Sequence, residues 1–220
     1  MPSSPSAAPS PGLYPASPKT SSSAAGLFLK KFLKHGTRVA SVAPSSRFLS
    51  AATARFVDAT KPQTIVELGA GTGPVTAEIL RRMHPDSRLL ALELDDDFAA
   101  VLRQRFGDDP RATLVTGSAT DLDQHLNEAR LGRVDVFING LPTPSLPEVV
   151  VDSVMRMFAT RATDDHVPMS QITEMPWVYQ GLYRRMFLEV DFQFVLKNIP
   201  PGGVYHCRGV HPDYAEKLDL

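Results

Sequence analysis

A glycine-rich segment carries the clearest chemical signal in the sequence. Residues 66–73 read Val-Glu-Leu-Gly-Ala-Gly-Thr-Gly, after a short β-branched run and ahead of a helical pattern. Glycine lets a backbone turn sharply and approach a ligand closely. Twenty residues after Gly73, Glu93 stands near the end of the next apolar run. A carboxylate there can accept hydrogen bonds from both hydroxyls of a ribose, so these residues predict an adenosine-containing ligand.

The spacing of the three glycines separates the possible nucleotide sites. They follow G-x-G-x-G, which differs from the G-x-G-x-x-G of dinucleotide folds, and no P-loop Gly-Lys-Ser/Thr occurs. The E-x-G-x-G-x-G form resembles the first motif of class I S-adenosylmethionine-dependent methyltransferases. The resemblance implies S-adenosylmethionine as the cofactor, its amino-acid portion on the glycine loop and its ribose on the acid after the second strand. The residues it assigns are Glu67, Gly69, Gly71, Gly73, Glu93 and Leu94.

In the same family the adenine is held by a segment that corresponds to residues 114–122. Relatives commonly carry Gly-Asp-Ala there, with the aspartate on the adenine amino group, whereas this chain has Ser118 before Ala119. A serine hydroxyl can accept the same hydrogen bond, although more weakly than a carboxylate. Asp121 is near enough in the sequence to be a substitute.

The acceptor site is expected after the fourth strand, where residues 139–144 read Asn-Gly-Leu-Pro-Thr-Pro. Adenine and rRNA methyltransferases resemble the chain overall, but they carry an aromatic ring in place of Thr143, and that ring stacks on an extruded base. The missing platform, worth roughly 1–3 kcal/mol, argues against a nucleobase substrate. The predicted catalytic residues are Asn139, which is also expected to contact the cofactor, Gly140, Leu141 and Gln171.

Three further motifs point to one branch of the family. Residues 42–46 (Val-Ala-Pro-Ser-Ser), 140–142 (Gly-Leu-Pro) with 146–147 (Leu-Pro), and 198–201 (Asn-Ile-Pro-Pro) are similar to segments of bacterial phospholipid N-methyltransferases. The resemblance implies methylation of phosphatidylethanolamine, in up to three steps, toward phosphatidylcholine. Ornithine-lipid N-methyltransferases look similar and stay open. Two more functions stay open as well: an rRNA adenine N6-methyltransferase, and a non-catalytic module that binds cofactor or lipid.

Methylation turns a lipid amine into a bulky cation, which aromatic faces can hold. Trp177, Tyr179 and Tyr183 are the candidates, with core packing or anchoring at the membrane interface as their alternative roles. The six histidines lack metal-ligand spacing and Cys207 stands alone, so no metal site is expected.

Alternating strands and helices must position these residues. Strands are predicted at 64–68, 88–94, 112–116, 134–139, 167–173, 191–196 and 204–208. Helices are predicted at about 47–60, from the glycine turn to 83, at 97–106 and at 147–160. Such alternation implies a Rossmann-like α/β fold with a mostly parallel seven-stranded sheet and helices on both faces. The short connection between the last two strands implies an antiparallel pair at one edge.

Length and composition fit one domain of this kind. The chain has 220 residues, of which 43% are hydrophobic and 21% charged, enough for a single core. No apolar run approaches the roughly 18–20 residues that span a bilayer. A single cysteine excludes an intramolecular disulfide, and the cytosol is the default compartment.

Charge is divided unevenly along the chain. Residues 1–57 carry +7 without any acid, and the rest carries −8. On a helical wheel, residues 25–40 place apolar side chains opposite basic ones, as in helices that lie in a membrane interface. The residues assigned to this contact are Phe28, Lys30, Lys31, Phe32 and Lys34. A helix packed on the domain, with solvated lysines, is the alternative.

The domain organisation follows from these patterns. Residues 1–24, rich in proline and serine, are expected to be a disordered tail. Residues 25–40 form the basic helix that docks on a membrane, and 41–220 form the methyltransferase domain. We therefore expect a cytoplasmic monomer that associates peripherally with an anionic membrane surface and its lipid substrate, and that does not bind nucleic acid.

Overall fold

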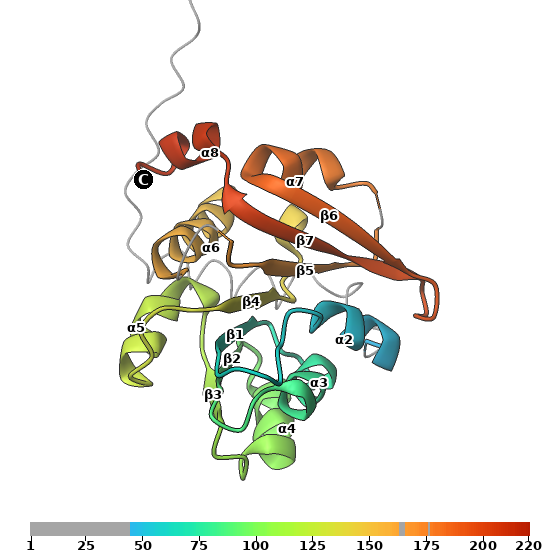
Figure 1. Ribbon diagram of the computed structural model, residues 1–220, viewed down its shortest axis with the longest axis vertical. Helices are drawn as coiled ribbons and strands as arrows, with labels where there is room; N and C mark the ends of the chain where they lie inside the picture. Colours follow the sequence, from blue (N-terminus) through green and yellow to red (C-terminus); the bar gives the residue numbers. More distant parts are fainter. Residues whose placement is uncertain (1–44, 163–165, 176) are drawn as a thin grey trace, which may run out of the picture.

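The computed structural model describes residues 45–162, 166–175 and 177–220. The predicted tail at 1–24 and basic helix at 25–40 lie outside these residues, as does part of the 42–46 motif. Figure 1 shows a central twisted sheet with helices on both sides. Within the described ranges, no helix has the length and apolar character needed to cross a membrane.

The described strands form one seven-stranded sheet in the order β3-β2-β1-β4-β5-β7-β6. Their bounds are β1 (Thr64–Leu68), β2 (Arg88–Glu93), β3 (Ala112–Thr116), β4 (Val136–Asn139), β5 (Met169–Thr173), β6 (Phe187–Val195) and β7 (Gly202–Val210). Strands β1 to β5 pair in parallel, and β7 pairs antiparallel with both β5 and β6. The predicted Rossmann-like fold with an antiparallel pair at one edge is confirmed. Within that pair, the reversed strand is β7, and β6 forms the edge (Figure 1).

Helices cover both faces of the sheet. One face carries α2 (Arg47–Thr53), α3 (Pro74–Arg82) and α4 (Asp96–Phe106). The other carries α5 (Leu122–Glu128), α6 (Glu148–Arg161), α7 (Gln180–Met186) and α8 (Pro212–Lys217). The sequence pattern did not predict α5, α7 and α8, because helices of six or seven residues are too short to show a helical period.

Strand β1 illustrates how the core is divided. Ile65 packs with α3 and α4, whereas Val66 and Leu68 pack with the helices of the opposite face. Successive side chains of a strand point to opposite faces, so a strand covered on both sides must be apolar at nearly every position. The exception is Glu67, which shares the α3 side with Ile65 and is buried there. A buried acid in a central strand indicates a special role for this position.

Helix α2 ends at Thr53, earlier than the predicted end at residue 60. Beyond Thr53, side-chain oxygens accept hydrogen bonds from the backbone amides that would donate to carbonyls in a longer helix. Asp58 Oδ1 accepts a hydrogen bond from Thr60 N at 2.7 Å, and Gln63 Oε1 accepts one from Asp58 N at 2.7 Å. Local bonds from side chain to backbone compete in this way with helix formation.

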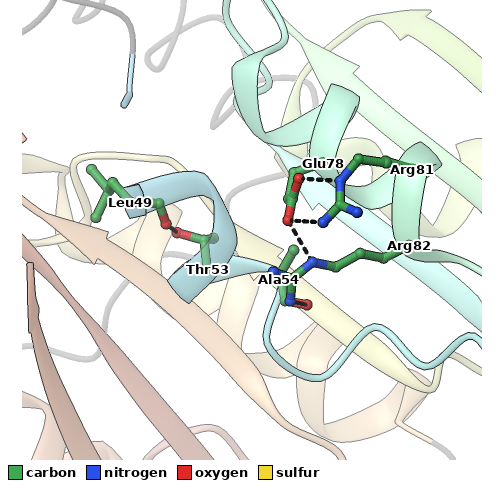
Figure 2. Close-up of polar contacts among 6 residues, drawn as sticks. All are labelled: Leu49, Thr53, Ala54, Glu78, Arg81 and Arg82. Atoms are coloured by element: carbon green, nitrogen blue, oxygen red, sulfur yellow. Dashed lines mark hydrogen bonds and ion pairs between the residues drawn. The ribbon is translucent and has the colours of Figure 1, made fainter. Parts of the chain in front are cut away.

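Helix α2 is joined to α3 by an arginine. Glu78 on α3 accepts hydrogen bonds from Arg81 and Arg82, as Figure 2 shows. Arg82 Nη1 also donates to Ala54 O, at the end of α2. The start of the described chain is therefore fastened to the helix that follows the glycine turn.

Candidate active site

A cleft of about 400 Å³ opens at the carboxyl ends of the parallel strands. Strand β1 lies between β2 and β4, so the order of the strands reverses beside it. In open α/β sheets, ligands bind at such a point. The walls of the cleft are the glycine turn after β1, the loop after β4 and the segment after β5.

The glycine turn has a backbone that other residues rarely adopt. Gly69, Gly71 and Gly73 have φ angles of +71°, +58° and +83°. Gly69 N donates a hydrogen bond to Leu92 O at 2.9 Å, which ties the turn to the end of β2. A Cβ on Gly71 would meet no other atom within 4 Å, because this part of the turn faces open space at the cleft.

Glu93 connects the end of β2 to the glycine turn. Its Oε2 accepts a hydrogen bond from Gly71 N at 2.7 Å, and its Oε1 accepts from Leu94 N and Asp95 N at 2.9 Å each. Burying a carboxylate costs free energy because it loses its hydrogen bonds to water. Three backbone amides offset this cost for the buried Glu93, since hydrogen bonds to an ionised group are stronger than neutral ones. Glu93 thereby fixes the shape of the turn, and its bonds to a ribose stay a prediction.

The turn and the cleft fit the cofactor that the motif implies. The uncovered backbone at Gly71 is a cradle that a side chain would fill. Phe98, in the first turn of α4, lines the same cleft and offers an apolar ring to an adenosine group. S-adenosylmethionine would be held by the glycine turn and by the carboxyl end of β2.

Glu67 lines the cleft from below the turn and is buried. Thr76 Oγ1, on α3, donates a hydrogen bond to Glu67 Oε2 at 2.7 Å. The pKa of Glu67 is raised to about 8, mainly by burial; the Thr76 hydrogen bond opposes this shift, and the nearby Glu93 charge contributes to it. Glu67 is therefore mostly protonated at neutral pH in the folded protein without a ligand.

Two of the predicted cofactor residues have other partners. A Cβ on Gly73 would lie 2.5 Å from Phe106 Cε2, so this glycine allows α3 and α4 to pack closely. Ser118 is buried, and its hydroxyl is 2.7 Å from Thr120 Oγ1 and accepts a hydrogen bond from Thr120 N. The Ser118 hydroxyl caps the short helical turn Ala119–Asp121, and its contact with adenine stays a prediction. Ala119 is buried in the core beside it.

The glycine turn and the acceptor loop touch each other. Gly140 N donates a hydrogen bond to Leu68 O at 2.8 Å. A Cβ on Gly140 would lie only 2.6 Å from Gly69 O, so only glycine fits at this crossing. Gly140 and Leu141 both line the cleft, and their predicted catalytic role stays a prediction.

Asn139 and Gln171 form a closed network under the acceptor loop. Asn139 Nδ2 donates to Gln171 Oε1 at 2.7 Å and to Thr143 Oγ1 at 3.0 Å, while Asn139 Oδ1 accepts from Leu141 N. Gln171 Nε2 donates to the carbonyls of Leu141 and Ile172. Both amides are thus fully used, and the geometry makes Asn139 and Gln171 positioning residues for the loop. Their direct catalytic contact with an acceptor, and the contact of Asn139 with the cofactor, stay predictions.

The three aromatic candidates have different surroundings. Tyr179 lines the cleft, and Trp177, which lies between the cleft residues Met175 and Tyr179 in the sequence, is 59% exposed. Tyr183 is only 2% exposed and packs on the Tyr205 ring with 4.7 Å between centroids. This burial agrees with the alternative role of core packing for Tyr183, and its contact with a head group stays a prediction.

Several cleft residues were missed by the sequence reasoning. Phe98, Glu174 and Met175 line the cleft, and Thr76 bonds to Glu67. A signal existed for Glu174, since it directly follows a strand whose carboxyl end faces the site. Thr76 has no local signal, because its contact arises only when α3 packs on β1.

The chain is similar in sequence to curated methyltransferases. It is 46% identical over 188 residues to the ornithine lipid N-methyltransferase of Singulisphaera acidiphila, covering 86% of this chain and 97% of that protein. It is 38% identical over 77 residues to the ribosomal RNA small subunit methyltransferase A of Geobacter metallireducens, covering 35% of this chain and 27% of that protein. Residues 45–130 match the family model described as ribosomal RNA adenine dimethylase.

Solved structures share the fold at low sequence identity. An rRNA methylase from Streptococcus thermophilus superposes with a TM-score of 0.53 and 15% identity, covering 74% of this chain and 94% of that one. Fibrillarin of Aeropyrum pernix, solved with natively bound S-adenosylmethionine, superposes with a TM-score of 0.51 and 14% identity, covering 68% of each chain. Identities this low show the fold alone.

We expect the substitution Glu93→Ala to weaken S-adenosylmethionine binding by roughly tenfold or more, because the glycine turn loses a charge-assisted hydrogen bond. Isothermal titration calorimetry measures this affinity. Asp97→Ala, at an exposed acid in the first turn of α4, is the matched control and should bind as the wild type does. Unchanged affinity in the Glu93 variant would disprove its role at the cofactor.

We expect Glu67→Gln to remove a destabilisation that appears as the pH rises. The folded state keeps the Glu67 proton up to a pKa of about 8, whereas the unfolded chain loses it near the ordinary glutamate pKa of 4.5. Stability therefore falls as pH rises between these values. Thermal unfolding without added cofactor should show that the stability of the variant, relative to that of the wild type, is higher at pH 8 than at pH 4. The same gain at both pH values would contradict the assignment.

Proposed function

The chain belongs to the lipid N-methyltransferase family of class I S-adenosylmethionine-dependent methyltransferases, and from this premise we propose that it methylates the free amine of an ornithine lipid. The observation that carries the proposal is the 46% identity to the ornithine lipid N-methyltransferase, which extends over 97% of that relative. An alignment of this extent includes the acceptor half of the domain as well as the cofactor half. Phosphatidylethanolamine, which the sequence motifs placed first, is the alternative head group and also presents a primary amine.

An RNA substrate has weaker support. The match to the rRNA family model ends at residue 130, before the acceptor loop after β4. In that loop Thr143 is buried and bonded to Asn139 and Gln171. The slot that would hold a stacking ring in a base methyltransferase therefore contains a hydroxyl that fixes the loop. The −8 charge of residues 58–220 also disfavours a phosphate backbone.

The chemistry requires a neutral amine in line with the methyl group. The cofactor, when bound, supplies an electrophilic methyl group on sulfur; a bond forms from nitrogen to carbon as the bond from carbon to sulfur breaks. The chain must hold the amine and take away one proton. The glycine turn and the acceptor loop meet at Gly140. Their contact would therefore set the distance between the methyl group of the cofactor and the lipid amine.

Glu174 is the residue that we assign to the amine. It is exposed and lines the cleft directly after β5. A lipid ammonium entering the cleft would pair with this carboxylate, and the carboxylate can accept its proton. Glu67, the other acid that lines the cleft, lies under the turn with its proton retained and is better placed for the cofactor.

The substrate is tested with methyl-labelled S-adenosylmethionine and the purified full-length chain. Three acceptors are compared: vesicles with ornithine lipid, vesicles with phosphatidylethanolamine, and ribosomal RNA. We expect label in the ornithine lipid, and mass spectrometry of the product counts the methyl groups. Label only in phosphatidylethanolamine would show that the ornithine head group is the wrong assignment. Label only in RNA would overturn the proposal of a lipid substrate.

We expect Glu174→Gln to lower kcat/KM for the lipid amine by roughly a hundredfold near neutral pH. The defect should shrink as the pH approaches the pKa of the amine, because free amine then forms without the carboxylate. Cofactor affinity should stay unchanged, and Glu216→Gln, at an exposed acid on α8, is the control. A defect that is equal at every pH would exclude proton transfer by Glu174.

A further inference from the structure

Large apolar side chains are exposed beside the mouth of the cleft. They come from α2, from the segment after β5 and from the connection between β6 and β7. We call them the apolar rim, which consists of Phe48, Met175, Trp177, Val178, Leu196 and Ile199. We propose that the apolar rim inserts into the lipid bilayer and holds the mouth of the cleft at the membrane surface. The inference rests on the lipid substrate proposed above.

The reversed direction of β7 brings the rim to the cleft. Thr173, the last residue of β5, pairs with Gly203, and Val195 at the end of β6 pairs with Gly202. The connection between β6 and β7 therefore lies at the carboxyl end of β5, where the cleft opens. Figure 1 shows this connection projecting at one end of the sheet, near α2. Met175, which follows β5, belongs to both the rim and the cleft wall.

Trp177 is held in a fixed position although its side chain faces solvent. Its ring lies 4.9 Å from the Phe194 ring and 5.9 Å from the Phe192 ring, both on β6. Its φ angle is +67°, a value that bulky residues rarely adopt and that persists only where the surroundings impose it. A tryptophan oriented outward in this way suits a membrane interface, where tryptophan is enriched.

Cations accompany the apolar side chains. Lys197 Nζ and the Arg47 guanidinium lie 4.9 and 4.7 Å from the centre of the Phe48 ring. Ser46 N donates a hydrogen bond to Asn198 Oδ1 at 2.8 Å, which fastens the start of α2 to the β6–β7 connection. Apolar side chains flanked by lysine and arginine complement a bilayer that contains anionic lipid.

The shape of the rim favours a bilayer as its occupant. Leu196 and Ile199 are 72% and 86% exposed in a connection that projects from the sheet. An amphipathic helix, from this chain or from a partner, binds a continuous apolar groove. Projecting single side chains instead match a fluid apolar phase that closes around each of them. A lipid whose amine enters the cleft would then keep its acyl chains in the bilayer.

The fluorescence of Trp177 tests the insertion directly, because it is the only tryptophan of the chain. The full-length protein is mixed with vesicles of phosphatidylcholine and phosphatidylglycerol, with and without brominated acyl chains. We expect emission typical of exposed tryptophan in the free protein, a shift to shorter wavelength with vesicles, and quenching by the brominated lipid. Emission at short wavelength before vesicles are added would mean that another part of the chain, such as residues 25–40, covers the rim, and would overturn the proposal.

A double variant tests what the rim contributes. Leu196→Ser together with Ile199→Ser keeps Trp177 as the reporter, and Leu188→Ser, 61% exposed at the other end of β6, is the matched control. Vesicle sedimentation should show roughly tenfold or greater loss of binding in the double variant and none in the control. Thermal unfolding confirms that both variants fold.

Activity separates docking from catalysis. The double variant should lose methylation of ornithine lipid in vesicles and keep wild-type turnover of a short-chain ornithine lipid that stays monomeric in water. Equal loss on both substrates, or vesicle binding like that of the wild type, would disprove a docking role. If the wild type methylates no lipid, the proposed function fails, while the fluorescence and sedimentation results still decide whether the rim inserts.

Discussion

The contact between the glycine turn and the acceptor loop is the constraint on which the site depends. A hydrogen bond from Gly140 N to Leu68 O joins them, and the space beside Gly69 O admits no side chain at residue 140. Catalysis of methyl transfer depends strongly on the relative position of the two reactants. Because the glycine turn and the acceptor loop are in contact at this crossing, neither can shift without the other.

Two buried networks support the crossing from either side. On one side, Glu93 binds the amide of Gly71 and fixes the turn. On the other, Asn139 and Gln171 use all their amide hydrogen-bonding groups to fix the loop. The side-chain amides of Asn139 and Gln171 therefore support the loop in this structure, and Glu174 is the exposed acid of the cleft to which we assign the lipid amine. Polar groups buried in this way hold one arrangement, since any other leaves them without partners.

The reversed strand β7 has a consequence for the substrate as well as for the sheet. If β7 were parallel to β6, the connection between them would have to leave the carboxyl edge and cross the sheet to the amino edge before the last strand could begin. Reversal puts the β6–β7 connection, with its exposed leucine and isoleucine, beside the cleft mouth. A membrane-docking rim at this edge would present the cleft to the plane in which a lipid amine lies.

The sequence by itself determined the strands from β1 to β5, the glycine turn and the position of Glu93, because these depend on local patterns that alternate along the chain. It also indicated that Gly140 and Leu141 lie at the cleft, since both directly follow a predicted strand. Only the tertiary structure decided that the Ser118 hydroxyl caps its own turn, that Tyr183 is buried on Tyr205, and that Glu174 and Met175 reach the cleft. These outcomes depend on which distant segments pack side by side, and residue type and spacing along the chain do not predict that packing.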